Sequence, residues 1–269
     1  MGAEKVTIAT FNCNSVRQRL EIIIEWLAYN DPDVLCLQET KVQDKDFPAQ
    51  AFQEAGYHAV FKGMKAYNGV AILSKQPPRD VSWGFGDDGA SDAELGKQDD
   101  ARLIRATFPA LTIVNTYAPQ GWEVDSPKYA YKLEWFRRFK AYLARNFTPR
   151  DPVLWTGDLN VAPEDIDVHD PEGLRGHVCF NPEICAAFRD VCAWGLIDVF
   201  RQHHPEPGQY TFWDYRGGAL ELNRGWRLDH LLATPPLAER CLDAHIDTEP
   251  REKENPSDHT FVVGVFSEH

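Results

Sequence analysis

Short apolar runs that end on polar residues dominate this sequence and limit the folds open to it. Nine such runs, five to eight residues long and mostly bounded by Pro, Gly, Asp or Asn, have the composition of β-strands. They cover residues 5–12, 33–38, 57–61, 69–74, 102–108, 111–118, 152–158, 227–234 and 260–266. Three segments with helical spacing lie between them, at 15–30, 126–146 and 181–195. The sequence therefore predicts an α/β protein.

Two of the helical segments carry further expectations. Ser15 and Gln18 have the spacing of a capping box, so the first helix is predicted to begin at Ser15. The segment 126–146 contains several cations, but an amphipathic row runs along it, at Leu133, Phe136, Lys140 and Leu143. These cations are predicted to lie on a solvated helix face, with a snorkelling lysine, and not to form a DNA-binding stripe.

The length of 269 residues suits one α/β domain spanning residues 1–269. No change in composition and no long Gly- or Ser-rich linker divides the chain, and an apolar fraction of 43% supplies a large core. Nine strands in a domain of this size favour two sheets packed face to face under outer helices.

Charge and cysteine content bear on the surroundings of the protein. A net charge of −13 argues against indiscriminate binding to polyanions, so any contact with nucleic acid should be local. The acidic stretch 86–102 is predicted to be a solvated loop that either biases the approach of DNA or keeps the protein soluble. Six cysteines without a C-x-x-C pair indicate buried thiols. With no signal-like N-terminus and no apolar span, we expect a cytoplasmic protein without membrane contact.

Polar side chains stand at the ends of several predicted strands. They are Asn12, Glu39, Tyr117, Asp158, Asn160, Asp229, His230, Asp258 and His259. A single Asp or Asn after a strand is more often a turn or capping residue than a ligand. Several together favour a common site, because α/β proteins gather chemistry in the loops at one sheet edge.

The chemistry of this residue set points to phosphate esters. Oxygen and imidazole groups without paired thiols suit a hard divalent cation, most simply Mg²⁺ or Mn²⁺. Such a cation neutralises charge on a phosphoryl oxygen and orients an attacking water, whose proton a nearby Asp or His can accept.

Eight ordered motifs make a family resemblance specific. They are TFNCNS, LCLQETK, YNGVAILS, NTYAPQG, GDLNVAPEDIDV, TFWDYR, NRGWRLDHLL and PSDHTFVV. With these motifs, over residues 6–266, the sequence resembles exodeoxyribonuclease III and its AP endonuclease relatives in the endonuclease/exonuclease/phosphatase superfamily. The resemblance implies a four-layer α/β sandwich, two mixed sheets between outer helices, with the active site at one sheet edge.

The resemblance also implies an activity and a partner. Members hydrolyse the phosphodiester 5′ to an abasic site in duplex DNA with Mg²⁺, and also act at 3′ ends as 3′→5′ exonucleases or by removing blocked groups. The expected partners are therefore duplex DNA with abasic sites or 3′ ends. A monomer is expected, because the sequence has no coiled coil or exposed apolar stripe.

Metal-side roles carry over position by position. By resemblance, Glu39 is the principal metal ligand with Asn12 beside it, and Asp258 is an additional carboxylate on the metal side. Asp158 and Asn160 of GDLN also adjoin the metal. Asp158 orients or deprotonates the attacking water, and Asn160 contacts the phosphate.

The remaining catalytic roles surround the phosphate. Tyr117 resembles a tyrosine near the scissile phosphate, and His259 is implied to contact a non-bridging oxygen. Asp229 is expected to accept the other ring N–H of His259, which fixes its tautomer. The sequence leaves open whether Asp158 or His259 is the general base, and we favour Asp158.

Substrate contacts are expected from three loops. The candidates are Asn68 with Lys65 nearby, Gln120 where many relatives have Asn, and Phe212, Trp213, Arg216 and Trp226. The aromatic stretch 209–227 could stack against an extruded sugar while its cations Arg216, Arg224 and Arg227 meet phosphates. An aromatic hairpin that packs on itself is the alternative for each of these rings.

Two other functions are compatible with this fold. One is a different phosphoesterase of the superfamily, such as an inositol-lipid phosphatase or a sphingomyelinase, although TFWDYR and NRGWR favour DNA. The other is a catalytically inactive regulator that binds RNA or protein. The motifs QET, GDLN and SDH are all present, which argues against loss of catalysis.

Overall fold

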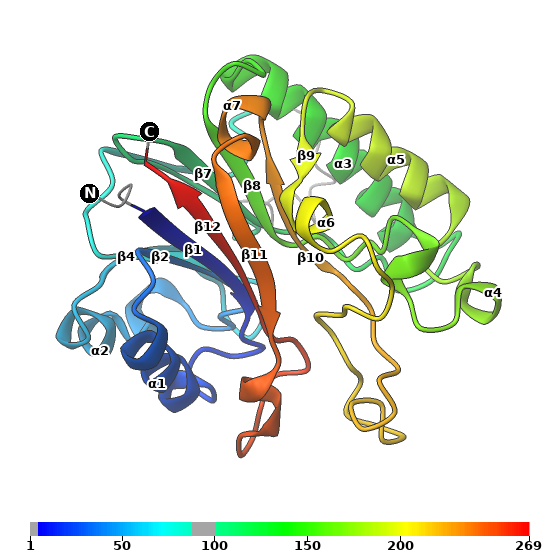
Figure 1. The fold of residues 1–269 in the computed structure, drawn as a ribbon, viewed down its shortest axis with the longest axis horizontal. Helices are drawn as coiled ribbons and strands as arrows, with labels where there is room; N and C mark the ends of the chain where they lie inside the picture. The colour runs from blue at the N-terminus through cyan, green and yellow to red at the C-terminus, as the bar shows by residue number, and fades with distance from the viewer. Residues whose placement is uncertain (1–4, 88–100, 269) are drawn as a thin grey trace.

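The computed structural model describes residues 5–87 and 101–268, and its strands form two six-stranded sheets. The strand order is β11-β12-β1-β2-β4-β3 in the first sheet and β5-β6-β7-β8-β10-β9 in the second. β1 and β2 are parallel, as are β7 and β8, and the other neighbouring strands are antiparallel. Both sheets are therefore mixed, as predicted, and they pack face to face (Figure 1).

The first sheet comprises β1 (Lys5–Asn12), β2 (Val34–Gln38), β3 (His58–Lys62), β4 (Val70–Ser74), β11 (Cys241–Asp247) and β12 (Phe261–Ser267). The second comprises β5 (Asp80–Trp83), β6 (Leu103–Thr107), β7 (Thr112–Tyr117), β8 (Val153–Asp158), β9 (Ile197–Asp198) and β10 (Asp229–Ala233). The helices are α1 (Leu20–Asn30), α2 (Ala49–Glu54), α3 (Pro127–Asn146), α4 (Pro171–Leu174), α5 (Pro182–Cys192), α6 (Val199–His203) and α7 (Pro235–Ala238).

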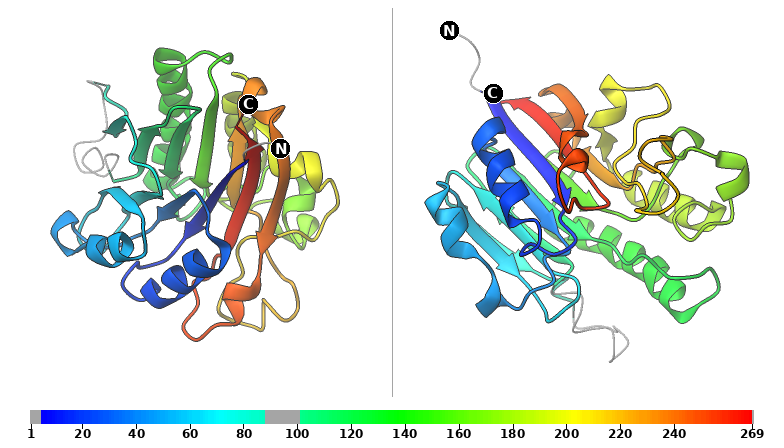
Figure 2. Two further views of the ribbon diagram at one scale, coloured as in Figure 1. Left: turned by 60° about the vertical axis from the view of Figure 1, so that its left-hand side comes forward. Right: turned by 90° about the horizontal axis from the view of Figure 1, so that it is seen from below.

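Each sheet buries apolar side chains on both of its faces. Between the sheets, Cys36 of β2 belongs to the same apolar cluster as Ile113 of β7 and Leu154 of β8. Because side chains alternate along a strand, the neighbouring Leu37 and Trp155 face the outer layers. α1 and α2 cover the first sheet, while α3 and α5 cover the second (Figures 1 and 2). The predicted four-layer sandwich is confirmed.

All nine predicted strands are present, and three more were missed. The missed strands β5, β9 and β11 lie at sheet edges, as β3 does. Edge strands are covered on one side only and tolerate polar residues, as in the β11 sequence CLDAHID. Their hydrophobic pattern is correspondingly weak.

The predicted capping box of the first helix is wrong. α1 begins at Leu20, and no side chain caps it. The amide of Ser15 instead donates to the carbonyl of Glu39 at 2.8 Å, and the amide of Val16 donates to that of Thr40 at 3.1 Å. The backbone of residues 13–16 therefore pairs with the turn at Glu39, so these residues do not form the first turn of the helix.

The cations of α3 also differ from expectation. Lys132 is fully buried and Arg138 is largely buried, so the predicted solvated face is wrong for these two. Lys140 pairs with Asp190 of α5 at 2.6 Å. All six cysteines are free thiols, and four of them are buried as predicted, whereas Cys192 and Cys241 are half-buried. Most of the acidic stretch 86–102 lies outside the described residues.

Within the described residues, no helix combines the length and apolar character needed to cross a membrane.

Candidate active site

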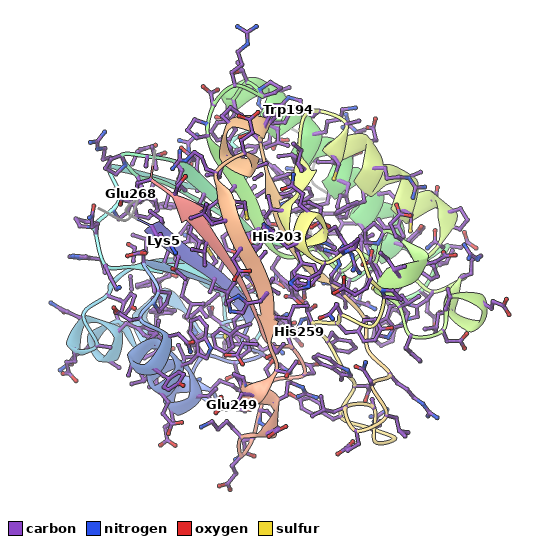
Figure 3. All side chains as sticks on the ribbon, viewed as in Figure 1. Lys5, Trp194, His203, Glu249, His259 and Glu268 are labelled. Atoms are coloured by element: carbon purple, nitrogen blue, oxygen red, sulfur yellow. The ribbon has the colours of Figure 1, made fainter. Side chains whose placement is uncertain are left out.

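Strand register brings three predicted catalytic residues into one row at the edge of the second sheet. Tyr117 at the end of β7 lies opposite Asp158 of β8, which lies opposite Asp229 of β10. His259, just before β12, reaches this row from the first sheet (Figure 3). Residues far apart in the sequence thus meet because the strands that carry them end at the same edge.

Hydrogen bonds hold the Asp158 carboxylate from two sides. The side-chain amide of Asn12 donates to Oδ2 at 2.8 Å, and the backbone amide of Asn160 donates to Oδ1 at 2.9 Å. Nε2 of His259 lies 3.7 Å from Oδ2. Asp158 therefore joins the end of the first sheet to that of the second.

The pKa of Asp158 is raised to about 7, chiefly by burial. The carboxylates of Asp229 and Glu39 raise it further, while the imidazole of His259 lowers it. Since a catalytic base works best with a pKa near the operating pH, this environment suits Asp158 to accept a proton.

Asp229 and His259 form a buried dyad. Oδ2 of Asp229 lies 2.7 Å from Nδ1 of His259, as predicted from the resemblance. Burial alone would lower the pKa of His259, but Asp229 and Asp158 raise it to about 10. Thr211 fixes the strand that carries Asp229, because its hydroxyl accepts the Asp229 amide at 3.1 Å. At neutral pH the dyad presents an imidazolium beside Asp158.

We expect Asp229→Asn to lower kcat on a phosphodiester substrate by about 10- to 100-fold, because His259 loses the carboxylate that orients it. The variant is compared with Asp243→Asn, which changes an exposed Asp–His pair on β11, 3.0 Å from His245. Equal activities of the two variants would contradict the role of Asp229.

The Glu39 carboxylate occupies a polar cluster at the end of β2. Asn12 donates to its Oε1 at 2.9 Å, and the ammonium of Lys41 lies 2.8 Å from its Oε2. Burial alone would raise the pKa of Glu39, but Lys41 and the hydrogen bond from Asn12 bring it below the ordinary value. Asn14 links this cluster to Asp258, whose Oδ1 it contacts at 3.1 Å.

Asn160 and Tyr117 complete the predicted catalytic set. Asn160 has a left-handed backbone (φ 51°), and its side chain donates to the carbonyl of Ala118 at 3.0 Å. The ring of Tyr117 lies 4.9 Å from the guanidinium of Arg102. Burial, followed by the charge of Glu39, raises the pKa of Tyr117 well above its ordinary range, so its phenol stays protonated.

The donor set fits a hard divalent cation. The Glu39 and Asp158 carboxylates both accept from the side-chain amide of Asn12, Asn160 also donates to Asp158, and Asn14 links Asp258 to them, so three carboxylates that can supply oxygen ligands belong to one cluster. Asp158, Asp229 and His259 also place possible ligand atoms within 4.8 Å of one another. The imidazolium of His259 would repel a cation from the dyad, whereas on the Glu39 side a bound cation would take the place of the Lys41 ammonium, which lies 2.8 Å from Oε2 of Glu39 on a partly exposed side chain.

The predicted DNA-contacting aromatic residues occupy different environments. Phe212 is half-buried, and its ring lies 5.0 Å from that of His259. Trp213 is buried, and its indole N–H donates to Asn223 at 3.1 Å within the same loop. Trp226 is half-buried and lies 4.6 Å from the His177 ring. Trp213 therefore packs within its own loop, as in the alternative prediction, whereas the Phe212 ring lies beside the Asp229–His259 dyad.

The polar candidates differ in exposure, and Asn68 is buried. Asn68 has a left-handed backbone and accepts the amide of Lys41 on its carbonyl at 2.9 Å, which connects it to the Glu39 turn. Lys65, Gln120 and Arg216 are exposed.

Arg227 is not available to DNA, contrary to the prediction. Its guanidinium is buried and contacts Asp167 at 2.7 Å and Asp198 at 2.8 Å. The side chain of Arg201 pairs with the same Asp167. Arg227 therefore belongs to a buried ion-pair network beneath the substrate loop.

Sequence reasoning missed several residues that shape the site. Lys41, Asn14 and Thr211 lie in the quoted motifs LCLQETK, TFNCNS and TFWDYR, and adjacency to predicted ligands was the available signal. Lys132 contacts the backbone of Asn160, and nothing in its helical pattern distinguished it from a surface lysine.

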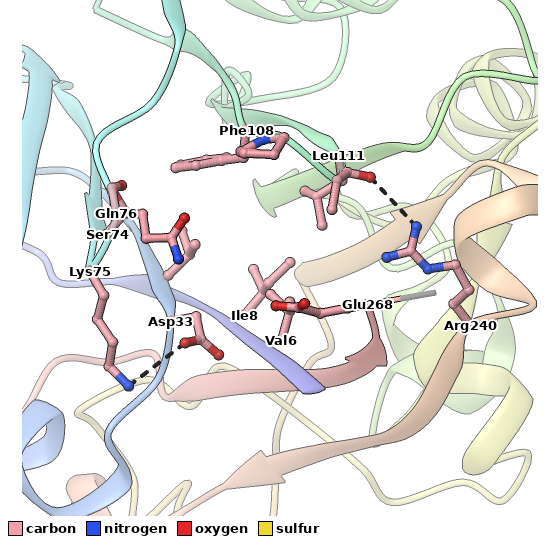
Figure 4. Close-up of a pocket in the computed structure, with 13 residues that line it drawn as sticks. Val6, Ile8, Asp33, Ser74, Lys75, Gln76, Phe108, Leu111, Arg240 and Glu268 are labelled. Carbon is pink, nitrogen blue, oxygen red and sulfur yellow. Dashed lines mark hydrogen bonds and ion pairs between the residues drawn. The ribbon is translucent and has the colours of Figure 1, made fainter. Parts of the chain in front are cut away.

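A cavity of about 650 Å³ lies at the other end of the strands (Figure 4). Its lining includes Val6 of β1, Asp33 just before β2, Leu111 just before β7 and Arg240 just before β11. None of the predicted site residues lines it, so it is separate from the catalytic cluster.

Comparisons with known proteins agree with this architecture. Exodeoxyribonuclease III of Haemophilus influenzae is 36% identical over 268 residues, covering 96% of this chain and 98% of that protein. A solved AP endonuclease from Archaeoglobus fulgidus has a TM-score of 0.92 and 49% identity, covering 97% of this chain and 99% of that one. A Neisseria 3′ phosphatase, NExo, solved bound to a product DNA hairpin, has a TM-score of 0.90 and 37% identity, with coverage of 97% and 99%. The endonuclease/exonuclease/phosphatase family model matches residues 9–259, and the chain belongs to this family.

Proposed function

We propose that the protein is a DNA-repair phosphodiesterase that incises duplex DNA 5′ to abasic sites in a single catalytic domain. The observation that carries this proposal is the buried Asp229–His259 dyad beside Asp158, at the edge where Glu39 and Asn12 also converge. The similarity to an AP endonuclease with 49% identity supports the same substrate. Relatives described as a 3′–5′ exonuclease and as a 3′ phosphatase support accompanying activities at 3′ ends.

In this mechanism Asp158 is the general base. It takes a proton from the water as the water oxygen bonds to phosphorus. The bond from phosphorus to the leaving oxygen breaks, its electron pair stays on that oxygen, and solvent protonates it to a hydroxyl. The His259 imidazolium donates a hydrogen bond to a non-bridging phosphate oxygen, and Asp229 keeps the ring oriented. Asn160 and Tyr117 contact the same phosphate from the second sheet.

We propose Mg²⁺ as the cofactor, with Mn²⁺ able to replace it, because the donors are oxygens. Glu39 and Asp258 would hold it together with Asn12, Asp158 and Asn160. When bound, the cation neutralises negative charge on the phosphoryl oxygens.

Substrate contacts follow from exposure and position. We assign Phe212 to the abasic sugar, because it lies against the His259 ring and remains half-exposed. Trp213 shapes the same pocket through the loop that it packs. Arg216, Trp226, Gln120 and Asn68 meet the DNA backbone or sugar around this point. With a net charge of −13, binding depends on these local contacts. We expect a cytoplasmic monomer.

We expect Phe212→Ala to raise KM for an abasic duplex about tenfold and to leave the melting temperature within a few degrees of wild type. The reason is that the ring is only partly buried, packs at the margin of the cluster between α3 and the second sheet, and so keeps access to substrate. Tyr29→Ala, which removes an exposed aromatic side chain on α1, is the control. A large fall in melting temperature with unchanged KM would assign Phe212 to packing.

A substrate panel tests the proposed function. We expect incision of a duplex with one internal abasic analogue, slower removal of nucleotides or phosphate from 3′ ends, and no hydrolysis of phosphoinositides. Hydrolysis of phosphoinositides without DNA cleavage would indicate another phosphoesterase of the family. RNA binding without any hydrolysis would indicate the inactive regulator.

A further inference from the structure

Lys132 on α3 is a fully buried lysine whose ammonium group contacts no carboxylate at hydrogen-bond distance among the described residues. Its Nζ donates to three backbone carbonyls, of Gln120 at 3.1 Å, Asn160 at 2.7 Å and Val178 at 2.9 Å. Nζ also lies 3.8 Å from Sγ of Cys179, so the three N–H donors are satisfied by three carbonyls at shorter range with the thiol beside them. A buried ammonium satisfied in this way ties together the segments that supply those carbonyls.

Two of these carbonyls belong to candidate site residues. Asn160 holds the proposed base directly, because its backbone amide donates to Oδ1 of Asp158 at 2.9 Å and its side chain lies 3.3 Å from Oδ2. Lys132 therefore contacts a residue, Asn160, that itself contacts the proposed general base Asp158. It also fixes the turn of Gln120, whose side chain accepts the amide of Trp122 at 2.6 Å.

Gly121, which follows Gln120, leaves room for the Lys132 side chain because it has no Cβ. Gly121 has φ 96°, and a Cβ placed there would lie 3.1 Å from Cδ of Lys132 and 2.9 Å from Cγ2 of Val178. The close approach of the turn to the lysine stem therefore depends on a residue without a side chain. Lysine, glycine and turn form one packed unit behind the site.

We propose that Lys132 is a positioning residue for the reaction, which holds the segment of Asn160, next to the Gln120 turn, so that the Asn160 side chain takes the geometry that catalysis requires. This inference rests on the proposed function, because it assigns Asn160 and Asp158 to the chemistry. Displacements of about 1 Å in such groups cost about 100-fold in rate. The effect of Lys132 is expected in kcat, because it touches no substrate.

The test compares Lys132→Met with Lys140→Met, which alters a half-exposed lysine of the same helix. On an abasic duplex with Mg²⁺, Lys132→Met is expected to lower kcat about 10- to 100-fold and to change KM less than about threefold. Lys140→Met is expected to match wild type. Melting curves ensure that both variants are folded at the assay temperature.

A double-mutant cycle with Asn160→Ala separates positioning from general destabilisation. Asn160→Ala keeps the backbone carbonyl that Lys132 contacts and removes only the side chain. If Lys132 acts by placing that side chain, then Lys132→Met lowers kcat less than about threefold in the Asn160→Ala background. Full, multiplicative losses would overturn the inference while leaving the proposed function intact. Normal activity of Asn160→Ala would instead overturn the site assignment on which the inference rests.

Should Lys132→Met be unfolded, the same cycle is run with Lys132→Arg. A planar guanidinium cannot reproduce three contacts made by one compact ammonium, so it is expected to displace the Asn160 carbonyl. A loss of kcat that disappears in the Asn160→Ala background supports the inference. Unchanged kcat, or a loss that persists in full, contradicts it.

Discussion

Asp158→Asn is expected to lower kcat for abasic-site incision by about 100- to 10,000-fold, the usual contribution of a general base. The amide cannot accept the proton of the attacking water. It also places a donor group in a site where Asn12 and Asn160 both donate. The measurement is single-turnover incision of a labelled abasic duplex with Mg²⁺, at protein concentrations well above the dissociation constant.

Asp165→Asn is the matched control, because Asp165 lies in the same GDLN-containing motif and pairs at the surface with Arg175 at 2.9 Å. We expect this control to retain full activity. Near-normal turnover by Asp158→Asn would contradict the assignment and would leave His259 as the candidate base.

Arg227→Met is expected to destabilise the fold by about 3 kcal/mol, because the half-buried Asp198 loses its guanidinium partner and the buried Asp167 is left with Arg201 alone. For a chain of this length the melting temperature should fall by roughly 10 °C. The exposed Arg224 of the same motif provides the control Arg224→Met, which should melt like wild type. Thermal denaturation followed by circular dichroism measures both variants.

The effect of Arg227→Met should depend on pH. Burial alone would raise the pKa values of Asp167 and Asp198, but Arg227 outweighs it and both lie below the ordinary value. Carboxylates with depressed pKa values stabilise the fold above their unfolded pKa, and this stability is lost as pH falls through the folded pKa. The gap between wild type and variant should therefore shrink below about pH 4. If Arg227→Met melts like wild type but binds DNA weakly, the buried ion-pair role is contradicted and Arg227 is a DNA-contacting residue, as first predicted.

The central strands and the layered fold could be predicted from local sequence patterns, whereas the strands at the sheet edges could not. Apolar runs such as 33–38 and 152–158 are buried on both faces and are evident from composition alone. The edge strand β11 has polar residues at Asp243, His245 and Asp247, so it lacks the continuous apolar run of a central strand. The false capping box at Ser15 shows a local motif overridden by pairing of the backbone with the Glu39 turn.

Site residues at the ends of strands were predicted from the sequence. Residues whose role depends on contacts between distant segments were missed. Asp158 and Asp229 come from motifs, and strand register then brings them together. Lys132 and Arg227 looked like surface cations, because only the three-dimensional fold supplies the carbonyls and carboxylates that bury them. Such partners leave no periodic signal in the sequence.

The central claim is that the cluster around Glu39 supports metal-dependent incision. The most direct measurement follows cleavage of a duplex with one abasic analogue, in Mg²⁺ and in EDTA, by wild type and Glu39→Ala. Glu25→Ala, at an exposed helix position that pairs with Lys253 at 3.4 Å, is the control. We predict incision that requires Mg²⁺, persists in Glu25→Ala and is lost in Glu39→Ala. Incision in EDTA, or undiminished incision by a folded Glu39→Ala, would contradict the account.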